Sequence, residues 1–176
     1  MEYKTLDRTI LIKSDHALVP LYGGKFAKID IESIPLVQSY RWYLSTHGYA
    51  NGRYVGRPHT NGFIPMHRII NHTPIGYETD HKNCNKLDNT SNNLRTVTKA
   101  QNNQNRVVYR GSSSKYKGVS WDKDCLKWRA GIVVNKHKKY LGLYVIEEAA
   151  ARIYDSYALA YFGKYSRLNF TEEMSL

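Results

Sequence analysis

Cysteine and long apolar runs are what this sequence most clearly lacks. Its two cysteines, Cys84 and Cys125, stand far apart and outside any C-x-x-C spacing, so we expect free thiols in a reducing compartment rather than a zinc knuckle. No apolar run approaches the ~20 residues needed to cross a bilayer, and Met1-Glu2-Tyr3-Lys4 does not begin a signal peptide. The sequence therefore predicts a cytoplasmic protein that does not enter a membrane.

Acidic residues are also scarce. The 176 residues include 26 Lys and Arg against 15 Asp and Glu, which gives a net charge of +11. Residues 1–110 carry +7 and residues 111–176 carry +4, so both halves of the chain are basic. This excess suits a polyanionic partner, because each phosphate neutralised by Lys or Arg releases counterions.

A change of composition at Gly111-Ser112-Ser113-Ser114 predicts a flexible linker between two domains. The segment before it is rich in asparagine, whereas the segment after it has aromatic and β-branched residues and then many alanines. We expect a first domain with a β-rich N-terminal part over residues 1–60 and its functional core over 61–110, then the linker over 111–114 and a second domain over 115–171.

The N-terminal part is the hardest to interpret. Residues 34–44 predict a short helix with Trp42 as a core anchor, and Gly23-Gly24 predicts a turn. Short apolar runs predict strands at residues 10–12, 17–19, 26–29 and 49–54.

Residues 77–105 give a clearer pattern. Two predicted strands, 77–81 and 94–98, are joined by a loop over 82–93 that is rich in asparagine. Thr98, with Gln101 three residues further on, forms a capping-box pattern and predicts that a helix follows.

The second domain predicts a three-stranded antiparallel sheet covered by one helix. Strands are expected at residues 116–121, 128–134 and 138–144, and a helix from Glu147 to Phe162 that ends at Gly163. The chain as a whole is predicted to be α+β. The apolar stripe of the helix is expected to include Ala150, Ile153, Tyr154, Tyr157, Ala160 and Tyr161.

Asp80-His81 is the candidate catalytic pair. Hydrolysis of a phosphodiester needs a base that activates water and a cation that stabilises the charge on the leaving oxygen. Asp80 and Asn102 supply oxygen ligands, which favour Mg²⁺ or Mn²⁺ over zinc. We expect these two residues to share one cation, while His81 stays off the metal and acts as the general base.

The sequence around this pair resembles the core of HNH homing endonucleases from phages and introns. The resemblance covers roughly residues 60–106 and depends on three spaced segments, 66–70, 80–98 and 101–106. It implies a ββα-metal (His-Me finger) fold with this ligand pair and this base.

Two asparagine assignments follow from the same resemblance. Asn93 matches the middle Asn of the motif, which braces the loop and positions the histidine of the catalytic pair. Asn102 stands where many members of the family have His, and Asn103 and Asn105 remain open as alternative second ligands.

Three basic residues near the pair allow two interpretations. His67 lies in an apolar run and is expected to be a buried, hydrogen-bonded structural histidine. Arg68 and Arg95 are candidates for phosphate contacts, although ordinary surface roles are as well supported.

The predicted sheet of the second domain is rich in basic residues, with aromatic residues among them. Residues 115–140 include eight Lys or Arg against two Asp, and four aromatic residues lie among them. Such a face suits the major groove of DNA, which admits β-ribbons, although Trp128 is expected to be a core residue. Arg129, Lys136 and Lys139 are candidates for phosphate contacts.

Residues 112–170 resemble the plant ethylene-response-factor (Apetala-type) DNA-binding domain, over the segments 116–119, 127–130, 140–142, 147–155 and 168–170. The resemblance implies that the sheet lies in the major groove. Four positions depart from Arg or Glu in the plant domains, so the plant target sequence does not transfer. The matching DNA-facing positions are Lys117, Ser120, Asp122, Lys127, Gly131, Val133, Lys138 and Tyr140, and the departures are Ser120, Asp122, Gly131 and Val133.

Together these features favour a site-recognising, metal-dependent DNA endonuclease of the homing type. We expect it to act on double-stranded DNA as a monomer or weak dimer, in the cytoplasm of a phage-infected bacterium. The alternative is a non-catalytic DNA-binding regulator derived from such a nuclease, which the intact site residues argue against. RNA binding is less favoured, because the sequence has no RNP-type motif or GXXG loop.

Overall fold

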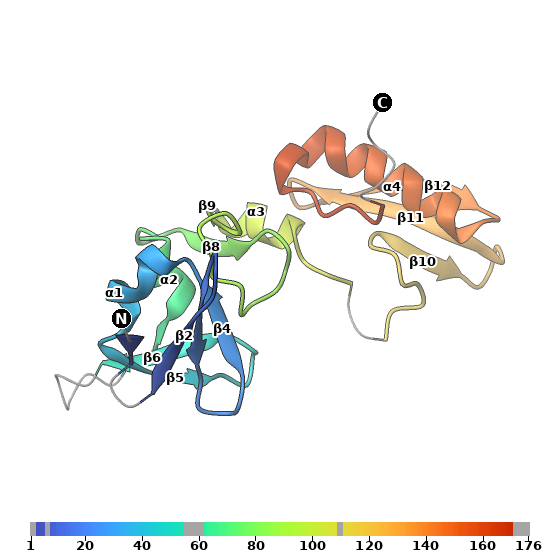
Figure 1. Cartoon of the computed structure of the whole chain (residues 1–176). Helices are drawn as coiled ribbons and strands as arrows, with labels where there is room; N and C mark the ends of the chain where they lie inside the picture. The colour runs from blue at the N-terminus through green and yellow to red at the C-terminus, as the bar shows by residue number, and fades with distance from the viewer. Residues whose placement is uncertain (1–2, 6–7, 55–61, 109–110, 171–176) are drawn as a thin grey trace. The chain divides into compact units, whose positions relative to one another are not determined.

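The computed structural model describes residues 3–5, 8–54, 62–108 and 111–170 (Figure 1). The chain divides into two compact units, Met1–Lys99 and Ala100–Leu176. The described residues form small antiparallel sheets and few helices, which confirms the predicted α+β class. None of the helices in these ranges is long and apolar enough to span a membrane. The predicted linker at 111–114 and the predicted domain bounds remain predictions.

A four-stranded antiparallel sheet opens the first unit. Its strands, in spatial order, are β1 (Tyr3–Lys4), β2 (Thr9–Ile12), β3 (Ala17–Pro20) and β4 (Phe26–Ile29). Alternate residues along β3 and β4 are fully buried, as expected of strands that cover a core with one face. The predicted strands at 10–12, 17–19 and 26–29 are confirmed.

The predicted helix over 34–44 is wrong beyond its first turn. After η1 (Ile31–Ser33), only α1 (Ile34–Val37) is helical, and β5 (Tyr40–Leu44) follows. Aromatic residues dominate β5, and they favour a pleated, half-buried surface over a helix. β5 then pairs with β6 (Ala50–Tyr54), which pairs with β7 (Ile64–Pro65), and α2 (Met66–Ile70) follows directly.

Trp42 is the core anchor of the first unit, as predicted. Its ring is almost fully buried, and its Nε1 donates a hydrogen bond of 2.9 Å to the Val37 carbonyl. Gly52 lies opposite Trp42 in the β5–β6 register, and a Cβ there would come within 2.6 Å of the indole. The glycine is therefore required by the close approach of the ring.

The hairpin of β8 (Glu78–His81) and β9 (Leu94–Val97), followed by α3 (Lys99–Gln104), confirms the predicted order of strand, long loop, strand and helix. Asp80 lies opposite Arg95 in this hairpin, and His81 lies opposite Leu94. The loop over 82–93 therefore starts and ends beside the candidate catalytic pair.

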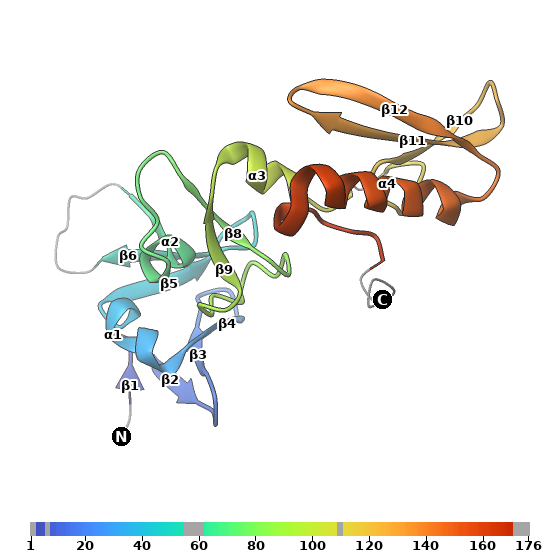
Figure 2. The same ribbon diagram turned by 90° about the horizontal axis from the view of Figure 1, so that it is seen from above.

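The second unit is a three-stranded antiparallel sheet of β10 (Val119–Asp122), β11 (Lys127–Val134) and β12 (His137–Tyr144), followed by α4 (Glu147–Phe162) and η2 (Gly163–Tyr165). Figure 2 shows α4 along one face of the sheet, which leaves the other face open. The predicted sheet, helix and Gly163 helix end are confirmed, but the first strand starts three residues later than predicted, after Gly118 at φ +77°.

The buried stripe of α4 differs from the predicted one. Most of the α4 residues that are buried against the sheet are small. Tyr157 and Tyr161 lie on the exposed side of the helix, with their rings stacked 6.3 Å apart. The buried residues of α4 are Ala150, Ala151, Tyr154, Asp155 and Ala158.

Candidate functional site

Asp80 is a buried carboxylate paired with Arg95 across the hairpin. The Nε and Nη2 of Arg95 lie 2.8 Å and 2.6 Å from Asp80 Oδ2. Only 6% of the Asp80 side chain and 16% of the Arg95 side chain are exposed. Arg95, a predicted phosphate contact, thus provides the counter-charge of the candidate metal ligand.

His81 is held from the loop by a residue that the sequence analysis did not single out. Its Nε2 lies 3.2 Å from Oδ1 of Asn89, and both side chains are buried. Because an amide oxygen only accepts hydrogen bonds, Nε2 carries the hydrogen and the lone pair of the neutral ring is on Nδ1. The contact therefore selects the tautomer in which Nδ1 can take up a proton.

The surroundings of His81 keep it neutral. Burial lowers the pKa of His81 below its ordinary value of 6.5, although the hydrogen bond to Asn89 and the charge of Asp80 oppose this effect. The rings of His67 and Tyr49 lie 5.1 Å and 5.9 Å from its ring, centroid to centroid. A neutral imidazole in a fixed orientation is the form that a general base requires.

Asn93 braces the loop over 82–93 at three points. Its Nδ2 donates to the Asp88 carbonyl at 2.7 Å, and its Oδ1 accepts from Asn83 N at 3.0 Å. Its backbone carbonyl accepts from Lys82 N at 2.9 Å. These bonds tie the two ends of the loop together directly after His81, although they do not test the catalytic role that the resemblance implies for Asn93.

Residues of β4 and of the segments after it anchor the same loop from outside. Backbone hydrogen bonds of 2.8 Å join Lys28 N to the Leu87 carbonyl and Asn89 N to the Lys28 carbonyl. Ser91 N donates to Asp30 Oδ2 at 2.7 Å, and Lys86 Nζ donates to the His47 carbonyl at 2.9 Å. Residues 28–47 therefore act as the scaffold that fixes the position of Asn89 against His81.

His67 is buried as predicted, at 9% exposure, but the predicted hydrogen bond is missing at one nitrogen. Among the residues described, its Nδ1 has no hydrogen-bond partner. Burial and the neighbouring His81 lower the pKa of His67 to about 3, so it is a neutral ring at physiological pH. Sequence alone could not give this outcome, because the rings that contact His67, those of Tyr49 and His81, come from other segments of the chain.

Arg68 is used within the fold. Its guanidinium donates to the carbonyls of Tyr77, Thr73 and Pro74, at 2.9, 3.4 and 3.3 Å. These bonds close the segment between α2 and β8. The structure thus supports a structural role for Arg68, and its predicted phosphate contact remains a prediction.

The side chains near Asp80 suit Mg²⁺ or Mn²⁺, which keep several water ligands, better than an ion that must be enclosed by protein ligands alone. Within the described ranges, no group of three or more His, Cys, Asp or Glu side chains could hold a metal ion. A single buried carboxylate suits Mg²⁺, which keeps several waters and binds substrate phosphates. Asn102 lies in α3 and belongs to the second compact unit, whereas Asp80 belongs to the first, so their shared ligation remains a prediction, as does the choice among Asn102, Asn103 and Asn105.

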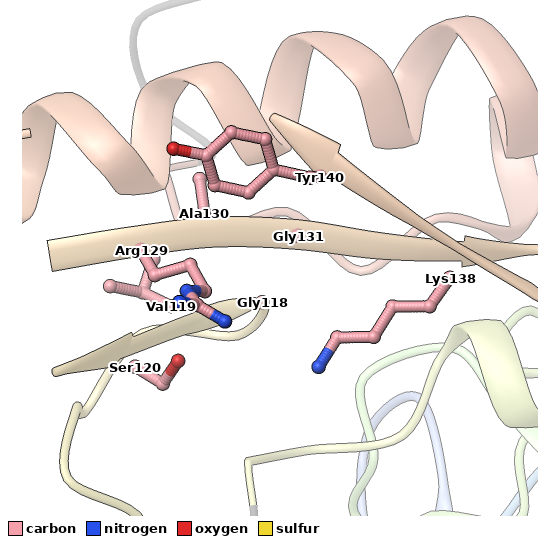
Figure 3. A pocket seen from close by; sticks show the side chains of 8 residues that line it. All are labelled: Gly118, Val119, Ser120, Arg129, Ala130, Gly131, Lys138 and Tyr140. Carbon is pink, nitrogen blue, oxygen red and sulfur yellow. The ribbon is translucent and has the colours of Figure 1, made fainter. Parts of the chain in front are cut away.

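The open face of the second sheet carries most of the predicted DNA-binding side chains. Lys127, Arg129, Lys138 and Tyr140 are all exposed. Figure 3 shows the charged ends of Arg129 and Lys138 pointing into the same space beside β11. Trp128 lies on the helix side, packed against the core and edge-on to Trp121 at 4.9 Å, as a core residue should.

Two predicted DNA-facing residues have internal partners. The Lys117 ammonium donates to the Gln104 carbonyl, and its backbone N donates to Asn169 Oδ1 at 2.7 Å. Asp122 is buried and paired with Arg129. Both therefore contribute to the fold of the second unit, whatever else they contact.

Comparisons with known proteins match this chain to one family profile and to two viral proteins. The sequence profile of the HNH endonuclease family matches residues 61–104. Over 146 residues the chain is 33% identical to an uncharacterized HNH endonuclease of Acanthamoeba polyphaga mimivirus, which covers 83% of this chain and 75% of that protein. Over 67 residues it is 34% identical to Protein 3.8 of Escherichia phage T7, and this match covers 38% of this chain and 54% of that protein. No solved structure matches the chain significantly.

Proposed function

This chain belongs to the HNH endonuclease family, and from that premise we propose that it is a site-recognising, metal-dependent DNA endonuclease of the homing type with a ββα-metal site. One observation carries the proposal: a buried, charge-compensated carboxylate precedes a buried neutral imidazole, and the loop that follows holds that imidazole in one tautomer. Base, ligand and scaffold are the three parts that hydrolysis of a phosphodiester needs.

His81 is the general base in this proposal. Its Nδ1 takes a proton from water as the water attacks the phosphorus in line with the departing 3′ oxygen. The bond to that oxygen breaks, a proton passes to it, and the products carry a 5′-phosphate and a 3′-hydroxyl. Asn89 and Asn93 keep His81 oriented, the first by direct contact and the second through the loop.

HNH nucleases generally use a divalent metal ion, and Mg²⁺ or Mn²⁺ held by Asp80 and Asn102 would stabilise the charge that develops on the phosphate and the leaving oxygen. Arg95 orients the Asp80 carboxylate through Oδ2 for that role. The burial of both residues keeps the carboxylate in one position and away from competing surface cations.

The second unit selects and holds the DNA in this proposal. Its open sheet face carries three cations and an exposed tyrosine, and its other face is covered by α4. A narrow antiparallel sheet of this kind fits the major groove, where base edges are distinguishable. The resemblance to the ethylene-response-factor domain supports the same arrangement.

A plasmid assay tests the proposal. Full-length protein is incubated with supercoiled plasmid that carries a sequence selected by the protein from random duplexes, with Mg²⁺, with Mn²⁺ or with EDTA. We expect cutting only with a divalent cation, and His81→Ala should abolish cutting but retain binding. His16→Ala, at a half-buried position between β2 and β3, is the matched control and should cut like the wild type. If the wild type binds the plasmid but leaves it uncut with both metals, the enzyme assignment is wrong.

A further inference from the structure

The open face of the second sheet has a hollow of about 420 Å³ beside β11 (Figure 3). Its lining includes the cations Arg129 and Lys138, the Tyr140 ring and the Ser120 hydroxyl. Gly131 contributes no side chain to it, and Ser120 lies opposite Arg129 in the register. The small residues on both sides of Arg129 leave space for a flat group to approach its guanidinium.

The guanidinium of Arg129 is fixed from behind by Asp122. The Asp122 side chain is 6% exposed, whereas that of Arg129 is 48% exposed, so the pair has one buried and one accessible partner. Oδ1 of Asp122 also accepts hydrogen bonds from the backbone N of Asp124 and Cys125, at 3.1 and 3.0 Å. The β10–β11 turn therefore fixes the position of the carboxylate, and the carboxylate fixes the position of the guanidinium.

Tyr140 lies beside Arg129 on the neighbouring strand. The guanidinium carbon lies 6.0 Å from the centre of the tyrosine ring. An arginine that is held by a buried carboxylate and flanked by an aromatic ring has lost part of its rotamer freedom before any ligand binds. Less entropy is then lost when its remaining N–H groups form hydrogen bonds.

These constraints favour a base edge over a phosphate as the ligand of Arg129. A phosphate contact needs only charge within reach, and flexible lysines such as Lys127 and Lys138 provide it on the same face. The O6 and N7 atoms of guanine require two parallel donors at a defined position, which a fixed guanidinium presents. Arg129 is the only arginine in the three strands, all of whose residues the structure describes.

We propose that Arg129 is the base-reading residue of this face and takes the O6 and N7 edge of a guanine in the major groove of duplex DNA. This inference rests on the proposed function, because it assumes that the open sheet face enters the groove. It assigns the arginine–guanine contact to a position other than those where the plant domains carry arginine. Asp122 is then a positioning residue, which acts through Arg129.

Selection from random duplexes tests the assignment. The full chain with His81→Ala, which should bind without cutting, is compared with the same chain carrying Arg129→Gln. We expect the wild-type face to select a site with one strongly preferred G·C pair, and Arg129→Gln to lower the discrimination at that pair by about 10- to 100-fold or to shift it toward A·T. The preference at the other positions should stay.

Salt dependence separates the base contact from a phosphate contact. If Arg129 contacts phosphate, Arg129→Gln should weaken binding to all sequences alike and reduce the salt slope by about one, with the selected site unchanged. That result would overturn the inference. Lys164→Gln, which removes one charge from η2, is the matched control and should leave the selected site unchanged.

A second variant covers the case in which Arg129→Gln does not fold. Asp122→Asn keeps an oxygen for the turn but loses the charge that holds Arg129, and circular dichroism verifies the fold. We expect reduced discrimination at the same G·C pair, and unchanged discrimination contradicts the inference. If the wild-type face selects no sequence at all, the site-recognising part of the proposed function fails instead, so the two failures are distinguishable.

Discussion

Asp80 and Arg95 face each other across the β8–β9 hairpin, with Arg95 Nη2 2.6 Å from Asp80 Oδ2. Both side chains are largely buried. A buried ion pair of this kind adds little net stability, but removal of one partner leaves the other without a counter-charge and costs roughly 3–5 kcal/mol. The carboxylate proposed to bind a divalent cation is thus already compensated by a cation from the protein.

Arg95→Gln should make the stability of the first unit depend on a divalent cation. Without metal, we expect the free energy of unfolding to fall by about 3 kcal/mol, because Asp80 loses its counter-charge. Added Mn²⁺ should raise the melting temperature of the variant more than that of the wild type, since the bound cation replaces the lost charge. Thermal unfolding with Mn²⁺ and with EDTA measures both effects. Arg41→Gln, an exposed change in β5, is the control, and equal metal effects in all three proteins would contradict metal binding at Asp80.

The contact between His81 and Asn89 gives a prediction about the pH dependence of cleavage. Burial lowers the pKa of His81 below 6.5, and the neutral ring is the active form, so cleavage should be lost only as the pH falls below 6.5. Asn89→Asp puts a carboxylate beside Nε2 and favours the charged ring. We expect the acid limb of the rate profile to move up by about one pH unit or more.

Initial cleavage rates between acid and neutral pH measure this shift. Asn92→Asp adds the same charge at an exposed position of the same loop, and it should leave the acid limb close to that of the wild type. An Asn89→Asp profile that overlies the wild-type profile would show that Asn89 does not control the protonation of His81.

Local signals decided which parts of the fold could be predicted. The α4 helix, its glycine end and the β11–β12 hairpin are confirmed because their residues carry strong local preferences, including Asn135, which favours the positive φ of the turn between β11 and β12. The segment over 34–44 has conflicting signals, since Pro35 starts a helix and the aromatic residues after it favour a strand. The prediction extended the helix too far because it gave no weight to the strand preference of these aromatic residues, which the packing of Trp42 in the core reinforces.

The candidate site was predictable only in part for a related reason. Asp80 and His81 are adjacent in sequence, so the pair itself was recognisable. The loop over 82–93 has five asparagines, and which of them reaches His81 depends on how the loop lies against β4. Leu87 was the available signal: it is the apolar residue of a polar loop, it packs against the core, and it brings Asn89 inside with it.

His67 should make the first unit less stable in acid. Its pKa is about 3 in the folded protein and 6.5 ordinarily, so the unfolded chain binds the proton first as the pH falls. Stability from the neutral ring is complete above pH 6.5 and decreases toward pH 3, by roughly 1.4 kcal/mol per pH unit. The free energy of unfolding in urea is measured for the wild type and for His67→Phe at about pH 7.5 and at about pH 5.5. Between these pH values the wild type should lose about 1.4 kcal/mol more than His67→Phe. A wild type that loses no more stability than His67→Phe would contradict the buried, neutral His67.

Asp155 should be essential to the second unit and irrelevant to the first. Its buried carboxylate accepts hydrogen bonds from Asn169 N, Asn169 Nδ2 and Phe170 N, at 2.8–2.9 Å, and so fixes the segment after η2 against α4. Asp155→Ala leaves these donors unpaired, and we expect the second unit to lose about 2–4 kcal/mol. Hydrogen exchange should show faster exchange in β10–β12 and α4, with β8 and β9 unchanged. Asp124→Ala, at an exposed turn, should change neither unit; equal exchange in both variants would refute the role of Asp155.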